Sequence, residues 1–120
     1  MNLMSGSFAR SFLPVLAGPL IWALHFVFIY AVHGVLCARP ALQGPLYATL
    51  YFWVLVAASA LALVAMAAIY LRLRAALRTS STSAFLLWLA GALSLLSALA
   101  IVWETIPVLW LPICDYLGTV

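Results

Sequence analysis

Three long uncharged stretches divide the chain, and polar residues are concentrated between them and at both ends. The first lies between Arg10 and Arg39, the second spans residues 46–71 and the third spans residues 84–103. About 20 apolar residues, at a rise of about 1.5 Å each, cross a hydrocarbon core of roughly 30 Å. The stretches are rich in Ala and Leu and lack the alternation of membrane barrel strands. The pattern predicts an all-α integral membrane protein, one domain over residues 1–120, with transmembrane helices at about 12–38, 46–71 and 84–106 and a C-terminal segment 107–120.

Composition agrees with this class. Of the 120 residues, 69% are hydrophobic and 6% are charged, and the mean hydropathy is +1.27. Five arginines and two acidic residues are too few to solvate a globule of this size, so a soluble enzyme is excluded. The net charge of +3 is also too sparse for a nucleic-acid footprint, and we expect no nucleic-acid partner. The expected surroundings are the lipid bilayer and other membrane helices.

The arginines indicate the direction in which the chain crosses the membrane. Three crossings place the N-terminus and the second connection on one side, and the first connection and the C-terminus on the other. The first side carries Arg10, Arg72, Arg74, Arg78 and the terminal amine. The second side has Arg39, offset by Asp115. Because Lys and Arg accumulate on the cytoplasmic side, we expect a cytoplasmic N-terminus and a periplasmic C-terminus. The first stretch is longer than the apolar core of a secretory signal, so we expect it to be retained.

The chain has two cysteines, and this topology brings both to the outer side of the membrane. Cys37 ends the first predicted helix and Cys114 follows the third. In an oxidising compartment such a pair tends to form a disulfide, which would tie the first helix to the segment after the third. We predict this bridge. The alternatives are two unrelated small apolar residues and a thiol metal or redox site.

Two histidines and one glutamate fall within or at the edge of the predicted spans. His25 lies near the middle of the bilayer and His33 two turns further out, and intramembrane ionisable residues are candidates for function. One interpretation of each histidine is a buried polar residue that forms hydrogen bonds to a neighbouring helix, and Ser94 and Ser97 lie at the right depth to be partners of His25. The other interpretation is a haem ligand, for which His25 lies at the better depth. Counting along the helices places Glu104 level with His33, so these two are the predicted ion pair or proton-exit pair. An interfacial glutamate solvated by headgroups is the alternative.

Three helix faces show the spacing of contact surfaces. On the third helix Ala90, Ser94 and Ala98 recur every four residues, which permits close approach of another helix. On the first helix His25 belongs to a heptad-like stripe and is expected to face protein. The other members of that stripe are Gly18, Trp22, Ile29, Val32 and Leu36. A similar small-residue face on the second helix consists of Ala57, Leu61, Ala65 and Ala68.

Motifs for catalysis are absent from the sequence: no phosphate-binding glycine loop, paired carboxylates, Ser-His-Asp grouping or zinc-ligand spacing occurs. We therefore expect no catalysis by this chain alone and predict no metal ligands. A transporter would need several polar groups converging near the bilayer midplane. The chain offers essentially one ionisable group there, His25.

Two segments nevertheless resemble a known group of proteins. Residues 18–26 (GPLIWALHF), continuing through Tyr30 to Cys37, and residues 103–107 (WETIP), ending in LPIC at 111–114, resemble small three-helix bacterial membrane proteins that accompany cytochrome c oxidase and its assembly factors. The resemblance implies a multi-pass protein of the bacterial inner membrane that stabilises or positions a respiratory complex. Its partner would be a haem-copper terminal oxidase, with this chain as a non-catalytic accessory or assembly subunit. The alternatives are a haem-binding electron-transfer subunit that uses His25, and a small homo-oligomeric transporter that uses His33 and Glu104.

Overall fold

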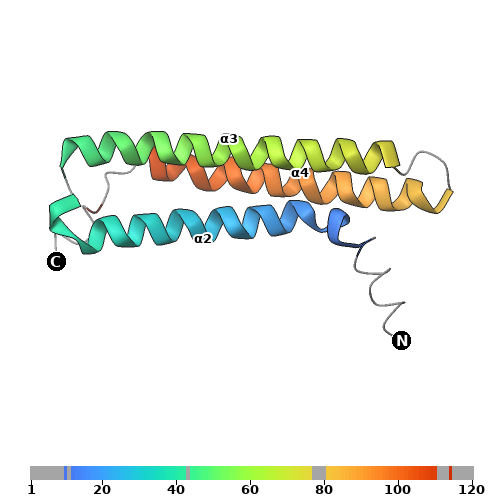
Figure 1. Cartoon of the computed structure of the whole chain (residues 1–120), viewed down its shortest axis with the longest axis horizontal. Coiled ribbons are helices and arrows are strands. Elements are labelled where there is room, and N and C mark those ends of the chain that lie inside the picture. Colours follow the sequence, from blue (N-terminus) through green and yellow to red (C-terminus); the bar gives the residue numbers. More distant parts are fainter. Residues whose placement is uncertain (1–9, 11, 43, 77–80, 111–113, 115–120) are drawn as a thin grey trace, which may run out of the picture.

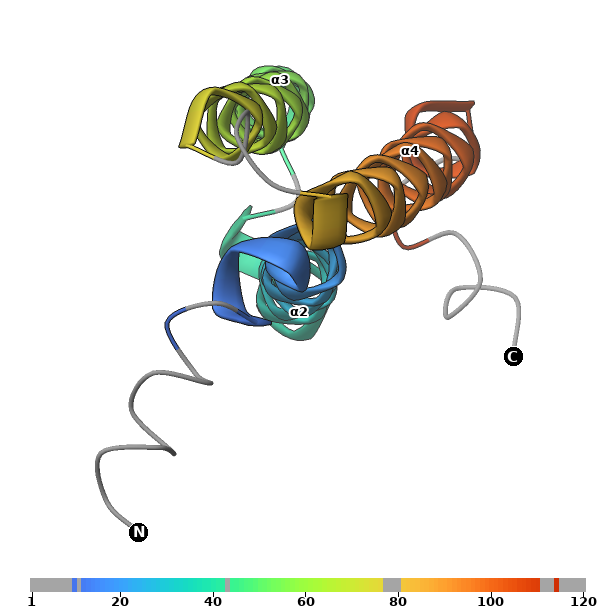
Figure 2. The ribbon, with the colours of Figure 1, turned by 90° about the vertical axis from the view of Figure 1, so that its right-hand side faces the viewer.

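The computed structural model describes residues 10, 12–42, 44–76, 81–110 and 114. Among these residues the chain forms helices and no strand: α2 (Ala17–Ala38), the short 3-10 helix η1 (Pro40–Leu42), α3 (Pro45–Ala76) and α4 (Ser81–Trp110). The helices α2 and α4 run in the same direction and α3 runs in the opposite one (Figure 1). Viewed end-on, the three long helices lie at the corners of a triangle, with α4 inclined to the other two (Figure 2). The prediction of an all-α fold is confirmed.

Within this described part, three helices are long and apolar enough to cross a membrane. Only 11% to 17% of the residues in the most apolar window of each helix are buried inside the chain. The outward surface is therefore made largely of apolar side chains, such as Leu24 and Trp103, and suits lipid or neighbouring helices. The structure agrees with a multi-pass membrane protein.

The two ends of the bundle differ. One end, termed the disulfide end, holds Cys37, η1 and the first residues of α3. The other, termed the arginine end, holds Arg72 and Arg74 in the final turns of α3 together with the start of α4. Arg78 and Asp115, which also entered the predicted charge balance, lie outside the described residues.

The first helix begins later than residue 12. Residues 12–15 are helical, but a turn at Leu16 separates them from α2. Pro19 explains the interruption, because it has no N–H to donate to the carbonyl of Val15 and its ring crowds that residue. Hydrogen bonds from Leu16 N–H to Phe12 O and from Leu20 N–H to Leu16 O keep the two helical stretches joined.

The other two helices extend beyond their predicted limits. The helix α3 continues past residue 71 to Ala76, because long arginine side chains can reach polar surroundings while the backbone stays helical. The helix α4 contains Pro107 and ends at Trp110, so residues 107–110 belong to the helix and not to the C-terminal segment. A proline this close to a helix end removes one backbone hydrogen bond and is tolerated.

The interior is divided into three layers along the bundle. An apolar cluster of Ile29, Tyr51 and Leu55 fills the disulfide end. A second apolar cluster lies toward the arginine end and contains Ala62, Met66 and Ile101. Between them lies a layer of polar side chains, termed the polar layer, contributed by all three helices: His25, Ser59, Glu104 and Thr105.

Small residues bring α2 and α4 together near the arginine end. A Cβ atom added to Gly18 would lie 2.8 Å from Cα of Ser94 and 3.1 Å from its backbone nitrogen. Ser94 is the middle residue of the face predicted on the third helix, and Ala90 of the same face is buried with 2% exposure. Only glycine at position 18 fits this approach of the two backbones.

The small-residue face predicted on the second helix is not used for contacts within the chain. Leu61 is 70% exposed, and Ala57 and Ala68 are exposed as well. At about 100° per residue, Ser59 lies on the opposite side of α3 from that face. Because Ser59 is the residue that α3 directs into the polar layer, the small-residue face must turn outward. The buried residues of α3 are Tyr51, Leu55, Ala62 and Met66.

Candidate functional site

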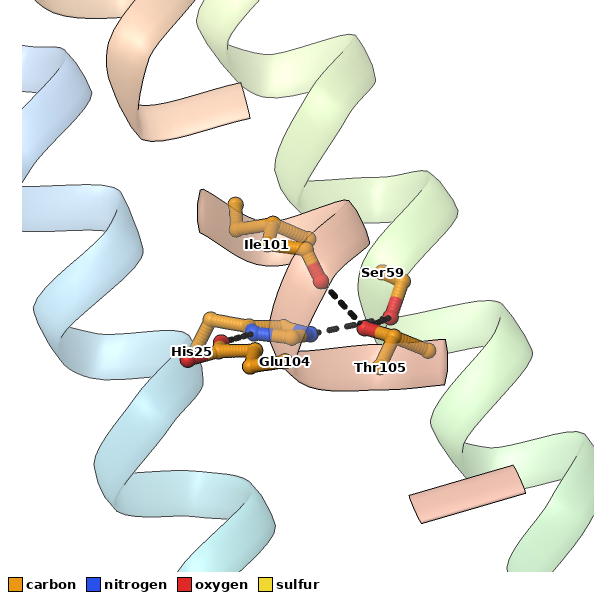
Figure 3. Close-up of polar contacts among 5 residues, drawn as sticks. All are labelled: His25, Ser59, Ile101, Glu104 and Thr105. Atoms are coloured by element: carbon orange, nitrogen blue, oxygen red, sulfur yellow. Dashed lines mark hydrogen bonds and ion pairs between the residues drawn. The ribbon is translucent and has the colours of Figure 1, made fainter. Parts of the chain in front are cut away.

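The polar layer is a continuous chain of hydrogen bonds across the three helices. Nδ1 of His25 lies 2.8 Å from Oε1 of Glu104, and Nε2 of His25 lies 3.0 Å from Oγ of Ser59. Oγ of Ser59 lies 3.2 Å from Oγ1 of Thr105, which lies 2.6 Å from the carbonyl oxygen of Ile101. His25 thus stands between α3 and α4 and contacts both (Figure 3).

The directions of these hydrogen bonds follow from the donors available. Thr105 has one hydroxyl proton and donates it to the carbonyl of Ile101, so Thr105 must accept from Ser59. Ser59 has then used its own proton and must accept from Nε2–H of His25. With Nε2 protonated, Nδ1 either donates to a Glu104 carboxylate as part of an imidazolium or accepts from a Glu104 carboxylic acid. In both cases the His25–Glu104 pair carries no net charge.

This neutrality matters because the pair lies deep in the apolar part of the bundle. The His25 side chain is 2% exposed and the Glu104 side chain 19% exposed. His25 is 13 residues before the end of α2, or about 20 Å along the helix. Burial of a lone charge at this depth would be costly, whereas a neutral, hydrogen-bonded pair avoids most of that cost. The polar layer therefore stabilises one arrangement of the three helices.

A second polar group lies two helical turns nearer the disulfide end. Nδ1 of His33 lies 3.1 Å from the hydroxyl oxygen of Tyr51, which is 3% exposed. Nε2 of His33 lies 3.7 Å from Sγ of Cys37, one turn further along α2. Cys37 in turn forms the predicted disulfide with Cys114, with the two Cα atoms 5.4 Å apart.

The predicted pairing of Glu104 with His33 is wrong, because Glu104 pairs with His25. The prediction assumed that the first and third helices start level at residues 12 and 84. The structure instead packs Gly18 against Ser94, which places Glu104 about one turn lower relative to α2. The partners of His25 also differ from the two serines predicted on the third helix, since Ser59 of α3 and Glu104 take their place.

Neither histidine suits a haem iron in this arrangement. Both ring nitrogens of His25 are hydrogen-bonded inside the bundle. The nitrogens of His33 face the Tyr51 hydroxyl and the Cys37 sulfur. Among the described residues, no group of three or more His, Cys, Asp or Glu is arranged to hold a metal ion.

Three residues of these two groups, Ser59, Thr105 and Tyr51, were not singled out from the sequence as site residues. Ser59 carried a usable signal, because it is the one polar side chain between Tyr51 and Tyr70.

No protein-family model, curated protein or solved structure matched this chain. Function is therefore inferred from the polar layer, the disulfide end and the outward faces.

Proposed function

We propose that the chain is a non-catalytic membrane subunit that docks onto a larger respiratory complex of the bacterial inner membrane. The resemblance of residues 18–26 and 103–107 favours a haem-copper terminal oxidase as that complex. In this role the three helices form a preassembled unit, held together by the polar layer and the disulfide, that stabilises or positions its partner.

The single observation that carries this proposal is the outward small-residue face of α3. Small residues on a membrane helix allow another helix to approach closely, yet the face with Ala57, Ala65 and Ala68 is not the one that α3 buries inside the chain. The polar layer supports the same role, because its hydrogen bonds are made within the chain. The outward face, termed the α3 docking face, consists of Ala57, Leu61, Ala65 and Ala68.

The proposed orientation rests on the charges and the disulfide. Arg72 and Arg74 extend from the last part of α3, and such residues are retained on the cytoplasmic side. The disulfide lies at the other end, where an oxidising periplasm would maintain it. We therefore place the arginine end in the cytoplasm and the disulfide end in the periplasm.

The test is co-purification of the tagged full-length chain from native membranes in mild detergent. We expect stoichiometric recovery with other membrane subunits and a haem absorption spectrum in that fraction. The double variant Ala57→Leu/Ala68→Leu should lower recovery of the partner at least about tenfold, which corresponds to about 1.4 kcal/mol. The matched control, Ala60→Leu/Ala67→Leu, changes two exposed alanines on another side of α3 and should leave recovery unchanged.

Other outcomes would redirect the proposal. Recovery of the wild-type chain as a lone monodisperse species would contradict docking. Recovery with a complex that contains no haem would be consistent with an accessory subunit but would exclude an oxidase as the partner. Recovery only with copies of the same chain would favour a homo-oligomer. A b-type haem spectrum of the isolated chain would support the haem-binding alternative. Proton-coupled flux in liposomes that contain the purified chain would support the transporter alternative.

A further inference from the structure

The disulfide end holds three metal-binding side chains in close proximity. Cys37 and Cys114 are bonded to each other, and Nε2 of His33 lies 3.7 Å from Sγ of Cys37. All three residues are partly exposed, so the group is not sealed inside the bundle. The polar layer and the α3 docking face do not use any of them.

We propose that reduction of the Cys37–Cys114 disulfide creates a binding site for Cu(I), formed by the two cysteine thiolates and Nε2 of His33. A dithiol reductant supplies two electrons and two protons, which break the S–S bond and leave two thiols, while the dithiol becomes a disulfide. Binding of one Cu(I) ion then releases the two thiol protons. The oxidised chain has no thiolate to offer, because both sulfurs are held in the disulfide.

The geometry of His33 and Cys37 already matches shared coordination. Metal–sulfur and metal–nitrogen bonds of about 2.3 Å and 2.0 Å, at angles of about 110–120°, separate the two ligand atoms by roughly 3.5–3.7 Å. The observed separation is 3.7 Å. The spacing of four residues on one helix face holds both side chains on the same side of α2. After reduction, binding of the metal therefore requires movement mainly of the Cys114 side chain, whose Cα lies 5.4 Å from that of Cys37.

Tyr51 prepares His33 for this role. A histidine that binds a metal through one nitrogen usually donates its other N–H to a fixed acceptor, which selects the tautomer. The Tyr51 hydroxyl lies 3.1 Å from Nδ1 of His33 and is held in the buried cluster with Ile29 and Leu55. While the disulfide is intact the Cys37 sulfur carries no proton, so Nε2–H of His33 donates to it and the Tyr51 hydroxyl donates to Nδ1. Binding of Cu(I) by Nε2 would move this proton to Nδ1, from which the Tyr51 oxygen can then accept it.

The donor set favours Cu(I) over other ions. Thiolates are soft ligands and select Cu(I) or Zn²⁺ over Mg²⁺, Ca²⁺ and Mn²⁺. Zn²⁺ in structural sites takes four protein ligands. Cu(I) is satisfied by two or three ligands, so His33, Cys37 and Cys114 are sufficient for Cu(I) after reduction.

The test is anaerobic titration of the purified full chain with Cu(I) in competition with a chromogenic chelator. We expect one Cu(I) per reduced chain and none per oxidised chain. Cys37→Ser and Cys114→Ser should each abolish this site, and His33→Leu should weaken it at least about tenfold. Tyr51→Phe should weaken it by about 10–100-fold, as for other outer ligand partners. Tyr47→Phe, which changes an exposed tyrosine one turn away, is the matched control and should have no effect.

X-ray absorption of the copper-loaded wild-type chain provides a readout that does not depend on any variant folding. Two sulfur ligands and one nitrogen ligand are the expected first shell. Failure of the reduced chain to bind Cu(I), equal binding by oxidised and reduced chains, or a shell without nitrogen would each overturn the proposal.

Discussion

Nδ1 of His25 lies 2.8 Å from Oε1 of Glu104 although 79 positions separate the two residues in the sequence. The contact fixes the height of α4 relative to α2. Gly18 against Ser94, 76 positions apart, and Cys37 bonded to Cys114, 77 positions apart, define nearly the same offset at two other heights. A close backbone approach, a polar contact and a covalent bond therefore hold one register along the whole length of α2.

The polar layer predicts different effects for two chemically similar threonines. Thr105 and Thr49 both donate to the carbonyl four residues earlier, but only Thr105 also accepts from Ser59. Thr105→Val should lower the free energy of unfolding by about 1 kcal/mol, because it removes one hydrogen bond and leaves the Ser59 hydroxyl without its acceptor. Thr49→Val should change it by less than about 0.5 kcal/mol.

Reversible unfolding in mixed micelles with increasing dodecyl sulfate, followed by far-ultraviolet circular dichroism, measures both threonine variants. Equal effects of the two substitutions would show that Ser59 and Thr105 do not depend on each other.

The approach of α2 to α4 predicts opposite effects at two glycines. Gly18→Ala places a methyl group 2.8 Å from Cα of Ser94, and because backbone must move to relieve this contact, we expect destabilisation of about 1–3 kcal/mol. Gly34 has no atom within 4 Å of an added Cβ, so Gly34→Ala should stabilise the helix by about 0.5–1 kcal/mol. The same unfolding assay compares them. Gly18→Ala as stable as the wild type would mean that the two helices do not meet at this point.

The disulfide predicts how the two thiols react in intact cells. Without reductant, a membrane-impermeant maleimide should not label the chain, because the two cysteines are bonded to each other. After reduction both should be labelled from outside. A cysteine introduced by Ala76→Cys at the arginine end, in a Cys37→Ser/Cys114→Ser background, should react only after permeabilisation. External labelling at this control position would reverse the proposed orientation.

The fold and the disulfide were predictable because both depend on the position of residues along the membrane normal. The uncharged stretches give three helices long and apolar enough to cross a membrane, and three successive antiparallel helices put Cys37 and Cys114 at the same end of the bundle. Neither prediction needs the rotation of a helix about its axis or its exact height.

The pairing within the polar layer depends on height and rotation, which apolar stretches define poorly. Counting from the edges of the stretches gave a level for Glu104 that was wrong by about one turn, because the first and third helices do not start level. Gly18, the second residue of α2, packs against Ser94, and α4 already begins at Ser81. The predicted disulfide offered a better reference, since an offset of 77 residues brings Glu104 within one turn of His25. The outward rotation of the face with Leu61 could not be read from residue size alone, because Ser59 decides it through its contact with His25.

A double-mutant cycle at His25 and Glu104 tests the central claim, that these residues form one neutral pair that holds the helices together. His25→Leu and Glu104→Leu should each lower the free energy of unfolding by about 3 kcal/mol, because each leaves a buried polar partner without its hydrogen bond. The double variant should lose less than the sum of the two by about 2 kcal/mol, since it removes both members of the pair. Strictly additive losses would contradict a direct interaction between the two side chains.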